Sequence, residues 1–393
     1  MNEISSMDLR SLPAGLTPEE RCNERRARIQ TESHADLSLL KTDGAHIGQA
    51  DEKNCEQMFG AVPLPVGYAG PLTVTFSSGE EWAVHLPLAT TEAALVASVN
   101  RGCKAVSTVP GGVRIQSVHH GISRSIVLKP KNQKKQSYTM EIGQQEKEWK
   151  VIGEKTSNHL KILKYETDEA DGYTFLTLFA DTDEAMGMNM ITIAAQAIGD
   201  WLAQKLDAEL ITVAANVDGD KKPGKRTHDR GRGYEVTAEA GIPFSVITEI
   251  LKTTPEHLLA VADAKLKTGS TLAGALGSNL HAANIVAALY LATGQDAAHV
   301  AEGSLADTTV EKTEDGIRMT VRLPAILVGV RGGGTGLPAQ SQCLDLLLKP
   351  ATKLHRKQQL AESIGAAVLA GELSLLAAQA SQSLASAHRK LAR

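Results

Sequence analysis

The sequence has few cysteines and no excess of basic charge. Its four cysteines lie far apart and form no CxxC pair, which fits a reducing compartment and excludes the usual zinc spacings. A net charge of −4 argues against a nucleic-acid binder that works by neutralising phosphates. No basic start precedes an apolar run in "MNEISSMDLRSLP", and no apolar run approaches the roughly 20 residues that cross a bilayer. We therefore expect a cytoplasmic protein with no membrane or nucleic-acid partner.

Several common motifs are also missing. No GxGxxG follows a strand and opens a helix, and GxxxxGK[ST], GxSxG and HExxH are absent. A nucleotide cofactor would therefore need a framework other than the standard dinucleotide fold. We predict no metal site.

What is present is an ordinary globular composition, with 42% hydrophobic and 22% charged residues among 393. Residues 1–50 are predicted to form an N-terminal helical arm that contacts another subunit, with Thr17 as N-cap and Pro18 in the first turn. Residues 124–212 combine strand-like and helix-like stretches, which predicts a small α+β domain. This domain is inserted into a large domain formed by residues 51–123 and 213–393.

Within the large domain, "VPLPVGYAGPL" has three prolines and two glycines and predicts a shaped loop. "ATTEAALVASVNRGCKAV" predicts a helix capped by Thr90 or Thr91, and "LHAANIVAALYLATG" predicts a buried central helix. The alanine- and leucine-rich tail predicts one long helix, with Gly371 as the point where it could break.

Several ionisable residues stand out by their placement. Glu92 would lie in the first turn of the predicted helix, where a carboxylate is favourable in any case. Asp296 follows a helix that Gly294 ends, so it is either solvated, raised in pKa or paired with a cation. Lys221 lies in the proline-stiffened turn "DGDKKPGK", and His388 lies near a helix end that stabilises imidazolium. Each of these residues, taken alone, is more often structural or solvated than catalytic.

The stretch "EAMGMNMIT" also allows two interpretations. Methionine fills irregular gaps in hydrophobic cores, which is the simpler explanation. Alternatively, Gly187 lets a ligand lie against the backbone while Asn189 supplies an amide.

Seven longer stretches of the sequence together resemble one known protein family. They are "NCEQMFGAVPLPVGYAGPL", "LATTEAALVASVNRGCKAV", "EAMGMNMI", "DKKP", "HAANIVAALYLATGQD", "VGVRGGGTGLP" and "LAGELSLLAAQAS…AH". In order and spacing, from about residue 50 to the C-terminus, they resemble the 3-hydroxy-3-methylglutaryl-coenzyme A (HMG-CoA) reductase family. The chain looks like a soluble prokaryotic-type catalytic unit, closer to the biosynthetic class I than to the mainly bacterial class II.

The resemblance implies an α+β fold. In it, a large helical domain for substrate binding and dimerisation carries an inserted small ferredoxin-like domain that binds the nucleotide. It also implies a four-electron reduction of HMG-CoA to mevalonate and free coenzyme A, with two NADPH, in the mevalonate pathway of isoprenoid biosynthesis. The active sites would lie at the interface of a homodimer, and a higher oligomer stays open.

Roles follow from the matching positions. Lys221 would stabilise the oxyanion on the substrate carbonyl, and Glu92 would protonate the aldehyde oxygen in the second reduction. Asp296 would bridge these two groups, and His388 would protonate the departing thiolate.

Further positions match binding residues of the family. For the substrate these are Arg124, Asp220, Lys222 and Lys265 at its carboxylate, Asn100 and Arg101 at coenzyme A, and His281 and Asn284 lining the site. For the nucleotide they are Ser157, Glu184, Met186, Gly187, Met188 and Asn189, with the glycine-rich loop Gly332, Gly333, Gly334 and Thr335.

Some positions depart from the family. Ala214 replaces a serine that contacts substrate, a loss worth roughly 0.5–1.5 kcal/mol. Asn158 stands where animal members carry arginine near the nucleotide. NADH therefore stays possible as the cofactor, as an alternative to NADPH. Two other functions stay open: a diverged acyl-CoA-binding pseudoenzyme, and the same fold oxidising mevalonate with NAD.

Overall fold

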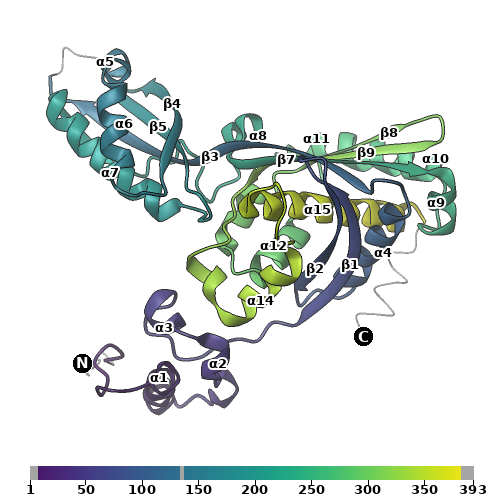
Figure 1. The fold of residues 1–393 in the computed structure, drawn as a ribbon, viewed down its shortest axis with the longest axis horizontal. Helices are drawn as coiled ribbons and strands as arrows, with labels where there is room; N and C mark the ends of the chain where they lie inside the picture. Colours follow the sequence, from purple (N-terminus) through teal and green to yellow (C-terminus); the bar gives the residue numbers. More distant parts are fainter. Residues whose placement is uncertain (1–7, 133–136, 382–393) are drawn as a thin grey trace.

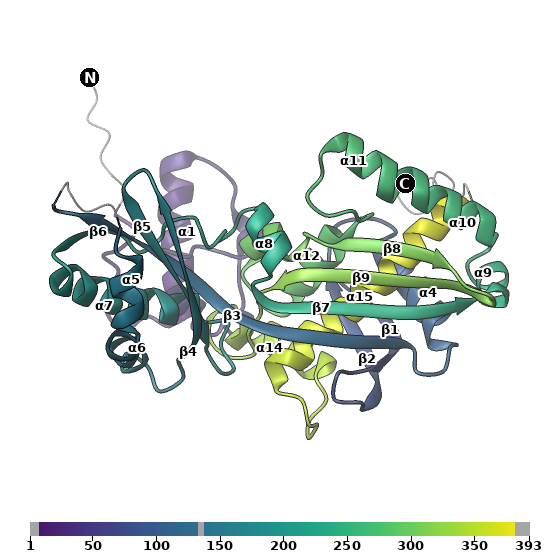
Figure 2. The same ribbon diagram turned by 90° about the horizontal axis from the view of Figure 1, so that it is seen from above.

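One long strand, β3 (Val113–Pro130), runs through both sheets of the protein (Figures 1 and 2). The computed structural model describes residues 8–132 and 137–381, and all structural statements concern these ranges. The first half of β3 pairs with β7 (Gly233–Pro243), and its second half pairs with β5 (Tyr173–Asp181). Gly121 lies at the crossing with a φ of 84°, and a Cβ there would lie 2.8 Å from the Ala180 carbonyl oxygen. Only glycine fits this crossing.

The larger sheet runs in the order β2 (Glu81–Ala89), β1 (Val66–Thr75), β3, β7, β9 (Gly316–Ile326) and β8 (Asp307–Lys312). Its strands alternate buried and less buried residues, because successive side chains point to opposite faces. The helices α4 (Leu95–Ser107), α12 (Ala282–Ala292) and α15 (Arg356–Ala380) share one continuous core with this sheet. The predicted buried helix at α12 is confirmed.

The smaller sheet has the order β4 (Lys161–Ala170), β5, β3, β6 (Ala208–Thr212). The helices α5 (Thr139–Gln144) and α6 (Glu146–Glu154) lie between β3 and β4, and α7 (Met188–Lys205) lies between β5 and β6. This β-α-β-β-α-β succession is the ferredoxin-like arrangement. A second hydrophobic core, around Trp149, fills the space between these helices and strands. The predicted α+β class and ferredoxin-like unit are confirmed, and the larger part combines its helices with a sheet.

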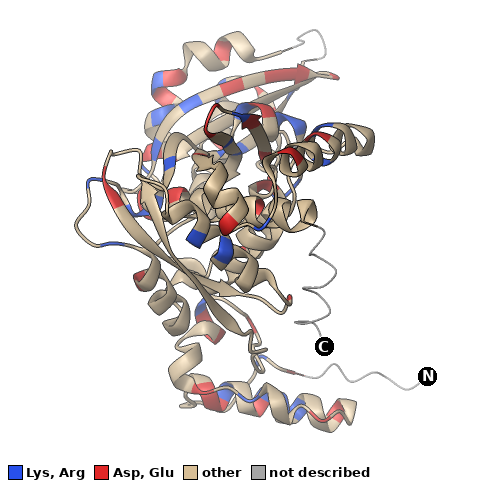
Figure 3. Cartoon of the chain, turned by 90° about the vertical axis from the view of Figure 1, so that its right-hand side faces the viewer, with Lys and Arg blue, Asp and Glu red and all other residues tan. Residues whose placement is uncertain are grey.

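The N-terminal segment packs around α1 (Pro18–Ser33). Thr17 and Glu20 form a reciprocal capping box at its start, which confirms the predicted cap. Arg21 donates to both oxygens of Asp51 at 2.6 and 3.0 Å and so joins α1 to α3 (Ala50–Lys53). Acidic and basic residues alternate along α1 (Figure 3), and Cys22, Arg25 and Arg26 are buried on the side that packs against the rest of the chain.

Shorter elements complete the chain. They are η1 (Ser38–Leu40), α2 (Gly44–Ile47), α8 (Lys225–Arg230), α9 (Phe244–Glu249), α10 (Pro255–Ala262), η2 (Asp263–Gly269), α11 (Ser270–Ala273), η3 (Ala297–His299), α13 (Val300–Gly303), η4 (Gly333–Gly336) and α14 (Pro338–Leu347).

Three local predictions were wrong. "VGYAGPL" is the start of strand β1 and not a loop, because Pro71 falls where the register with β2 is interrupted and needs no ladder hydrogen bond. Thr90 and Thr91 do not cap α4, which begins at Leu95 after Ala94 in a left-handed conformation. The C-terminal helix continues through Gly371, whose missing side chain admits Ile285 of α12.

Helix α15 is, among the described residues, the one helix long and apolar enough to cross a membrane. However, 94% of its apolar window is buried inside the protein. It crosses the middle of the larger core beneath the sheet (Figure 2), which accounts for its composition.

Candidate active site

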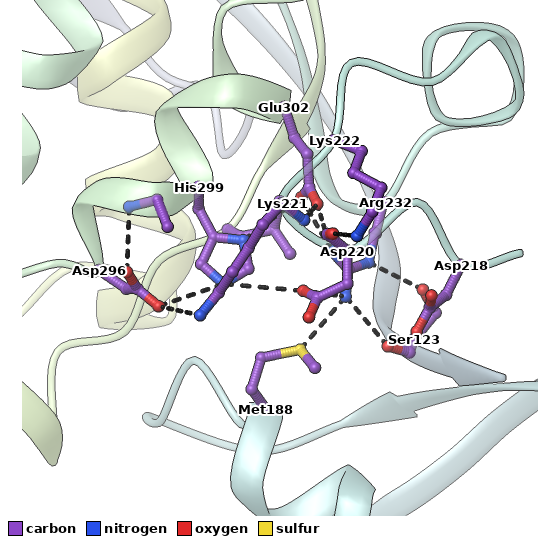
Figure 4. Close-up of polar contacts among 12 residues, drawn as sticks. Ser123, Met188, Asp218, Asp220, Lys221, Lys222, Arg232, Asp296, His299 and Glu302 are labelled. Atoms are coloured by element: carbon purple, nitrogen blue, oxygen red, sulfur yellow. Dashed lines mark hydrogen bonds and ion pairs between the residues drawn. The ribbon is translucent and has the colours of Figure 1, made fainter. Parts of the chain in front are cut away.

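The Lys221 ammonium lies 2.9 Å from the Asp296 carboxylate (Figure 4). Lys221 comes from the loop between β6 and α8, and Asp296 caps η3 by accepting from the Ala298 N–H at 3.0 Å. Partial burial opposes ionisation of Asp296, but the Lys221 ammonium and the Ala298 N–H outweigh it and hold its pKa below the usual value. The sequence left three possibilities for Asp296: a solvated carboxylate, a raised pKa or pairing with a cation. The structure shows pairing with a cation.

Asp220, next to Lys221, is held by two arginines. Arg232 Nη2 lies 3.2 Å from Asp220 Oδ1, and Arg124 Nη1 lies 3.4 Å from Asp220 Oδ2. Burial alone would raise the pKa of Asp220, but the charges of Arg232 and Arg124 keep it below the usual value. Lys222 points its ammonium to the Asp220 carbonyl at 3.0 Å and is otherwise exposed. The loop thus places several cationic groups close together, which suits an anionic substrate.

A buried charge network lies behind this loop (Figure 4). Arg232 Nη1 contacts both carboxylate oxygens of Glu302, at 2.7 and 2.8 Å, and both side chains are almost fully buried. His299, also fully buried, lies with Nδ1 3.4 Å from Glu302 and Nε2 3.7 Å from Asp296. Sequence reasoning missed Arg232, His299 and Glu302. The i,i+3 spacing from Asp296 to His299 to Glu302 was a signal, because such residues share one helix face.

The ligand atoms of Asp220, His299 and Glu302 lie within 4.8 Å of one another, as metal ligands would. The Arg232 guanidinium, however, already contacts two of these three side chains. A metal ion would have to displace a buried cation that neutralises them. The donor set therefore fits an ion-pair network and not a metal centre.

Glu92 lies outside the helix, in the turn that follows β2. Its N–H donates to Thr90 Oγ1 at 3.0 Å, and its exposed carboxylate accepts a hydrogen bond from the Asn284 amide on α12. Among the described residues, no ion pair or hydrogen bond joins Glu92 to Lys221 or Asp296. Because α4 begins only at Leu95, the predicted first-turn position is wrong; of the predicted site residues, Asn284 is hydrogen-bonded to Glu92 in the described structure.

The two predicted nucleotide segments lie against each other. The Val330 N–H donates to the Glu184 carbonyl at 2.8 Å, and a Cβ on Gly329 would lie 2.4 Å from the Met186 nitrogen. Gly187 begins α7 at a φ of 98° and abuts Thr182, while Met188 is buried and Asn189 is exposed. Core packing therefore accounts for Met188, while Asn189 is exposed and its role at a ligand stays a prediction.

The glycine-rich loop packs against Gly294, two residues before Asp296. A Cβ on Gly294 would lie 2.2 Å from the Gly334 carbonyl oxygen, and Thr335 Oγ1 closes the loop on the Gly332 carbonyl at 2.7 Å. Gly332 and Gly333 have φ values of 80° and 54°, which other residues rarely adopt.

Other predicted residues have structural partners of their own. Asn100 accepts from the Gly70 N–H at 3.0 Å, Arg101 donates to Ser374 on α15, and the His281 N–H donates to Glu372. Ser157 donates to the Met190 sulfur at 3.5 Å.

Lys265 lies on η2, and none of its side-chain polar contacts in the described structure reaches the Lys221 loop. His388 lies outside the described residues, so its role stays a prediction.

The fold and this site define a two-lobed α+β enzyme with a lysine–aspartate pair where its lobes meet. Its fold is that of solved HMG-CoA reductases. A structure of the class II enzyme from Streptococcus pneumoniae bound to NADPH in open conformations matches with a TM-score of 0.69. It is 20% identical, and the match covers 91% of this chain and 86% of that one.

The sequence itself shows the family. The family model "Hydroxymethylglutaryl-coenzyme A reductase" matches residues 21–393, so the chain belongs to this family. The reductase of Methanothermobacter thermautotrophicus is 37% identical, over 94% of this chain and 92% of its own. That of Haloferax volcanii is 38% identical, over 98% and 96%. The placement nearer class I stays a prediction.

Proposed function

We propose that this protein reduces HMG-CoA to mevalonate and free coenzyme A, with NADPH as the reductant. The observation that carries the proposal is the Lys221–Asp296 ion pair, which lies next to the glycine loop of the predicted nucleotide site. Family membership over residues 21–393 supports the same reaction.

NADPH supplies a hydride to the carbonyl carbon in each reduction. In the first, the Lys221 ammonium stabilises the negative charge that develops on the thioester oxygen. The carbon–sulfur bond then breaks, and the departing thiolate takes a proton from His388. In the second, the aldehyde oxygen takes its proton from Glu92, which a second copy of the chain would bring to Lys221 and Asp296. Asp296, kept ionised by its partners, holds the ammonium in place between these steps.

The residues at the start of α7 fit a nucleotide. This helix begins at Gly187 without a side-chain cap, so its first N–H groups stay available for an anionic group. Asn189 is exposed in the first turn and offers an amide. In this proposal the segment 124–212 binds NADPH, and the segments 51–123 and 213–393 bind the thioester.

A homodimer with shared active sites is the assembly we propose. Large apolar side chains in and after the N-terminal arm are exposed in the single chain: Leu39, Val62, Leu64, Val66 and Tyr68. A cavity of about 530 Å³ lies between this arm and α14. A second copy would cover such a patch. Glu92 is exposed and, in the described chain, forms no hydrogen bond or ion pair with Lys221, so in this proposal it completes its site across that interface.

One assay tests the reaction. Purified protein is mixed with HMG-CoA and NADPH, and oxidation of the nicotinamide and release of thiol are followed together. We expect two NADPH oxidised for each thiol released. Binding of the thioester without oxidation favours the acyl-CoA-binding pseudoenzyme. Faster turnover of mevalonate, coenzyme A and NAD favours the oxidative direction.

A further inference from the structure

Glu302, on α13, is a fully buried carboxylate that the reaction described above does not use. A buried charge is costly unless it is paired and hydrogen-bonded. Arg232 Nη1 satisfies both of its oxygens, at 2.7 and 2.8 Å. Glu302 therefore has a fixed partner of opposite charge.

Arg232 is itself anchored to the framework of both sheets. Its Nε donates to Ser123 Oγ at 2.9 Å and its Nη2 to the Ser123 carbonyl at 3.1 Å, both on β3. Its backbone N–H donates to the Pro324 carbonyl on β9 at 3.0 Å. The carboxylate of Glu302 is thus held at a defined place relative to the strands.

Besides the contact with His299 at 3.4 Å, this fixed carboxylate accepts a hydrogen bond from the backbone N–H of Lys221. Lys221 has a φ of 57°, in the left-handed region that lysine rarely adopts. A charge-assisted hydrogen bond to an anchored group supports such a backbone. From this turn the side chain extends to Asp296, where the two groups meet at 2.9 Å.

We propose that Glu302 is a positioning residue for Lys221. By holding the Lys221 amide, it fixes the left-handed turn from which the ammonium reaches Asp296 and the substrate oxygen. The proposal rests on the function proposed above. The competing explanation is that Glu302 only neutralises Arg232 and stabilises the fold.

The variant Glu302→Asp separates the two explanations. It keeps the negative charge opposite Arg232 but is one methylene shorter, so it cannot reach Arg232 and the Lys221 amide together. The matched control is Glu362→Asp. Glu362 is equally buried and accepts a backbone hydrogen bond, from Ser77 at 3.0 Å, but it has no contact with the site.

We expect kcat of Glu302→Asp to fall at least about tenfold, with KM for the thioester within about threefold, because small misplacements of a catalytic group are costly. The Glu362→Asp control should keep its kcat within about threefold of wild type, since its loss affects only stability. A wild-type kcat in Glu302→Asp, or equal losses in the two variants, overturns the proposal.

Hydrogen exchange gives a readout that needs neither activity nor a foldable variant. In the wild-type protein, the Lys221 amide should exchange slowly although its side chain is 43% exposed. Exchange as fast as in an unstructured peptide overturns the positioning role. A wild-type protein that exchanges slowly but oxidises no NADPH overturns the proposed function and supports the positioning of Lys221.

Discussion

Gln295 and Gly329 exchange two hydrogen bonds. The Gly329 N–H donates to Gln295 Oε1 at 2.9 Å, and Gln295 Nε2 donates back to the Gly329 carbonyl at 3.0 Å. Gln295 precedes Asp296, and Gly329 packs on Met186 in the predicted nucleotide segment. One amide side chain thus links the catalytic pair to the backbone against which we expect the cofactor to bind.

We expect Gln295→Ala to impair both catalysis and nucleotide binding. It leaves a part-buried N–H and carbonyl of Gly329 without partners, which costs about 1–3 kcal/mol. The lost energy should appear as a roughly tenfold fall in kcat/KM for NADPH, since about 1.4 kcal/mol is a factor of ten. Steady-state kinetics with varied NADPH measures it.

The control for this prediction is Gln196→Ala. Gln196 is exposed on α7 and its amide contacts only Asp200, so its removal should change kcat/KM by less than about twofold. An unchanged kcat/KM in Gln295→Ala would show that the link does not matter to the reaction.

Lys221→Ala should lose both reductions while it keeps the fold. Removing one group that stabilises an oxyanion costs about 10²–10³ in kcat. Lys221 is half-exposed, and its ion pair with Asp296 adds little to stability. Thioester and mevaldehyde are therefore offered separately to the variant, with circular dichroism as the check on folding.

Lys225→Ala is the matched control, because Lys225 lies four residues on and its ion-pair partner in the described part of the chain is the surface residue Asp229. Wild-type turnover of either substrate by Lys221→Ala would defeat the assignment of the lysine.

Local pattern was enough to predict much of the fold. The buried helix α12, the helix α7 and the N-cap at Thr17 each follow from residues within a few positions of one another. The network behind Lys221 does not, because Arg232 and Glu302 are 70 residues apart and meet only in the folded chain. Their pairing depends on how β7 and α13 pack, which no periodicity encodes.

The error at Glu92 has a similar cause. A threonine followed by an acidic residue and an apolar run is typical of a helix start. Here the Thr90 hydroxyl instead accepts from the Glu92 N–H and closes a short turn ahead of α4. This turn leaves Glu92 free to meet Asn284, so tertiary context overrides the local signal.

Gly187→Ala should destabilise the protein and weaken nucleotide binding. The residue would be strained at a φ of 98°, and its Cβ would lie 2.3 Å from the Thr182 hydroxyl oxygen. Backbone strain of about 1–2 kcal/mol and overpacking of about 1–3 kcal/mol together predict a loss of about 2–5 kcal/mol in the free energy of unfolding. Urea denaturation measures it, and titration with NADPH measures the affinity.

Gly172→Ala isolates the backbone part of this effect. Gly172 has a similar φ of 77°, but a Cβ there would meet nothing within 4 Å. Its loss in the free energy of unfolding should stay at about 1–2 kcal/mol, with unchanged NADPH affinity. Equal losses in the two variants would mean that contact with Thr182 plays no part.

Asp218→Asn should stabilise the protein at neutral pH and not in acid. Asp218 is buried without a hydrogen bond to either carboxylate oxygen, and this burial raises its pKa despite the charges of Arg232 and Arg124. Because the folded-state pKa lies above the unfolded one, its contribution to stability is present below the unfolded pKa and is lost as pH rises through the folded pKa. Asparagine does not titrate and suffers no such loss.

Urea unfolding at about pH 4 and about pH 7 measures this effect. The free energy of unfolding of the variant should rise relative to that of wild type at the higher pH. Asp200→Asn, at an exposed position on α7, should show no such gain. A variant that loses stability relative to wild type between the two pH values would mean that attraction to the arginines outweighs burial at Asp218.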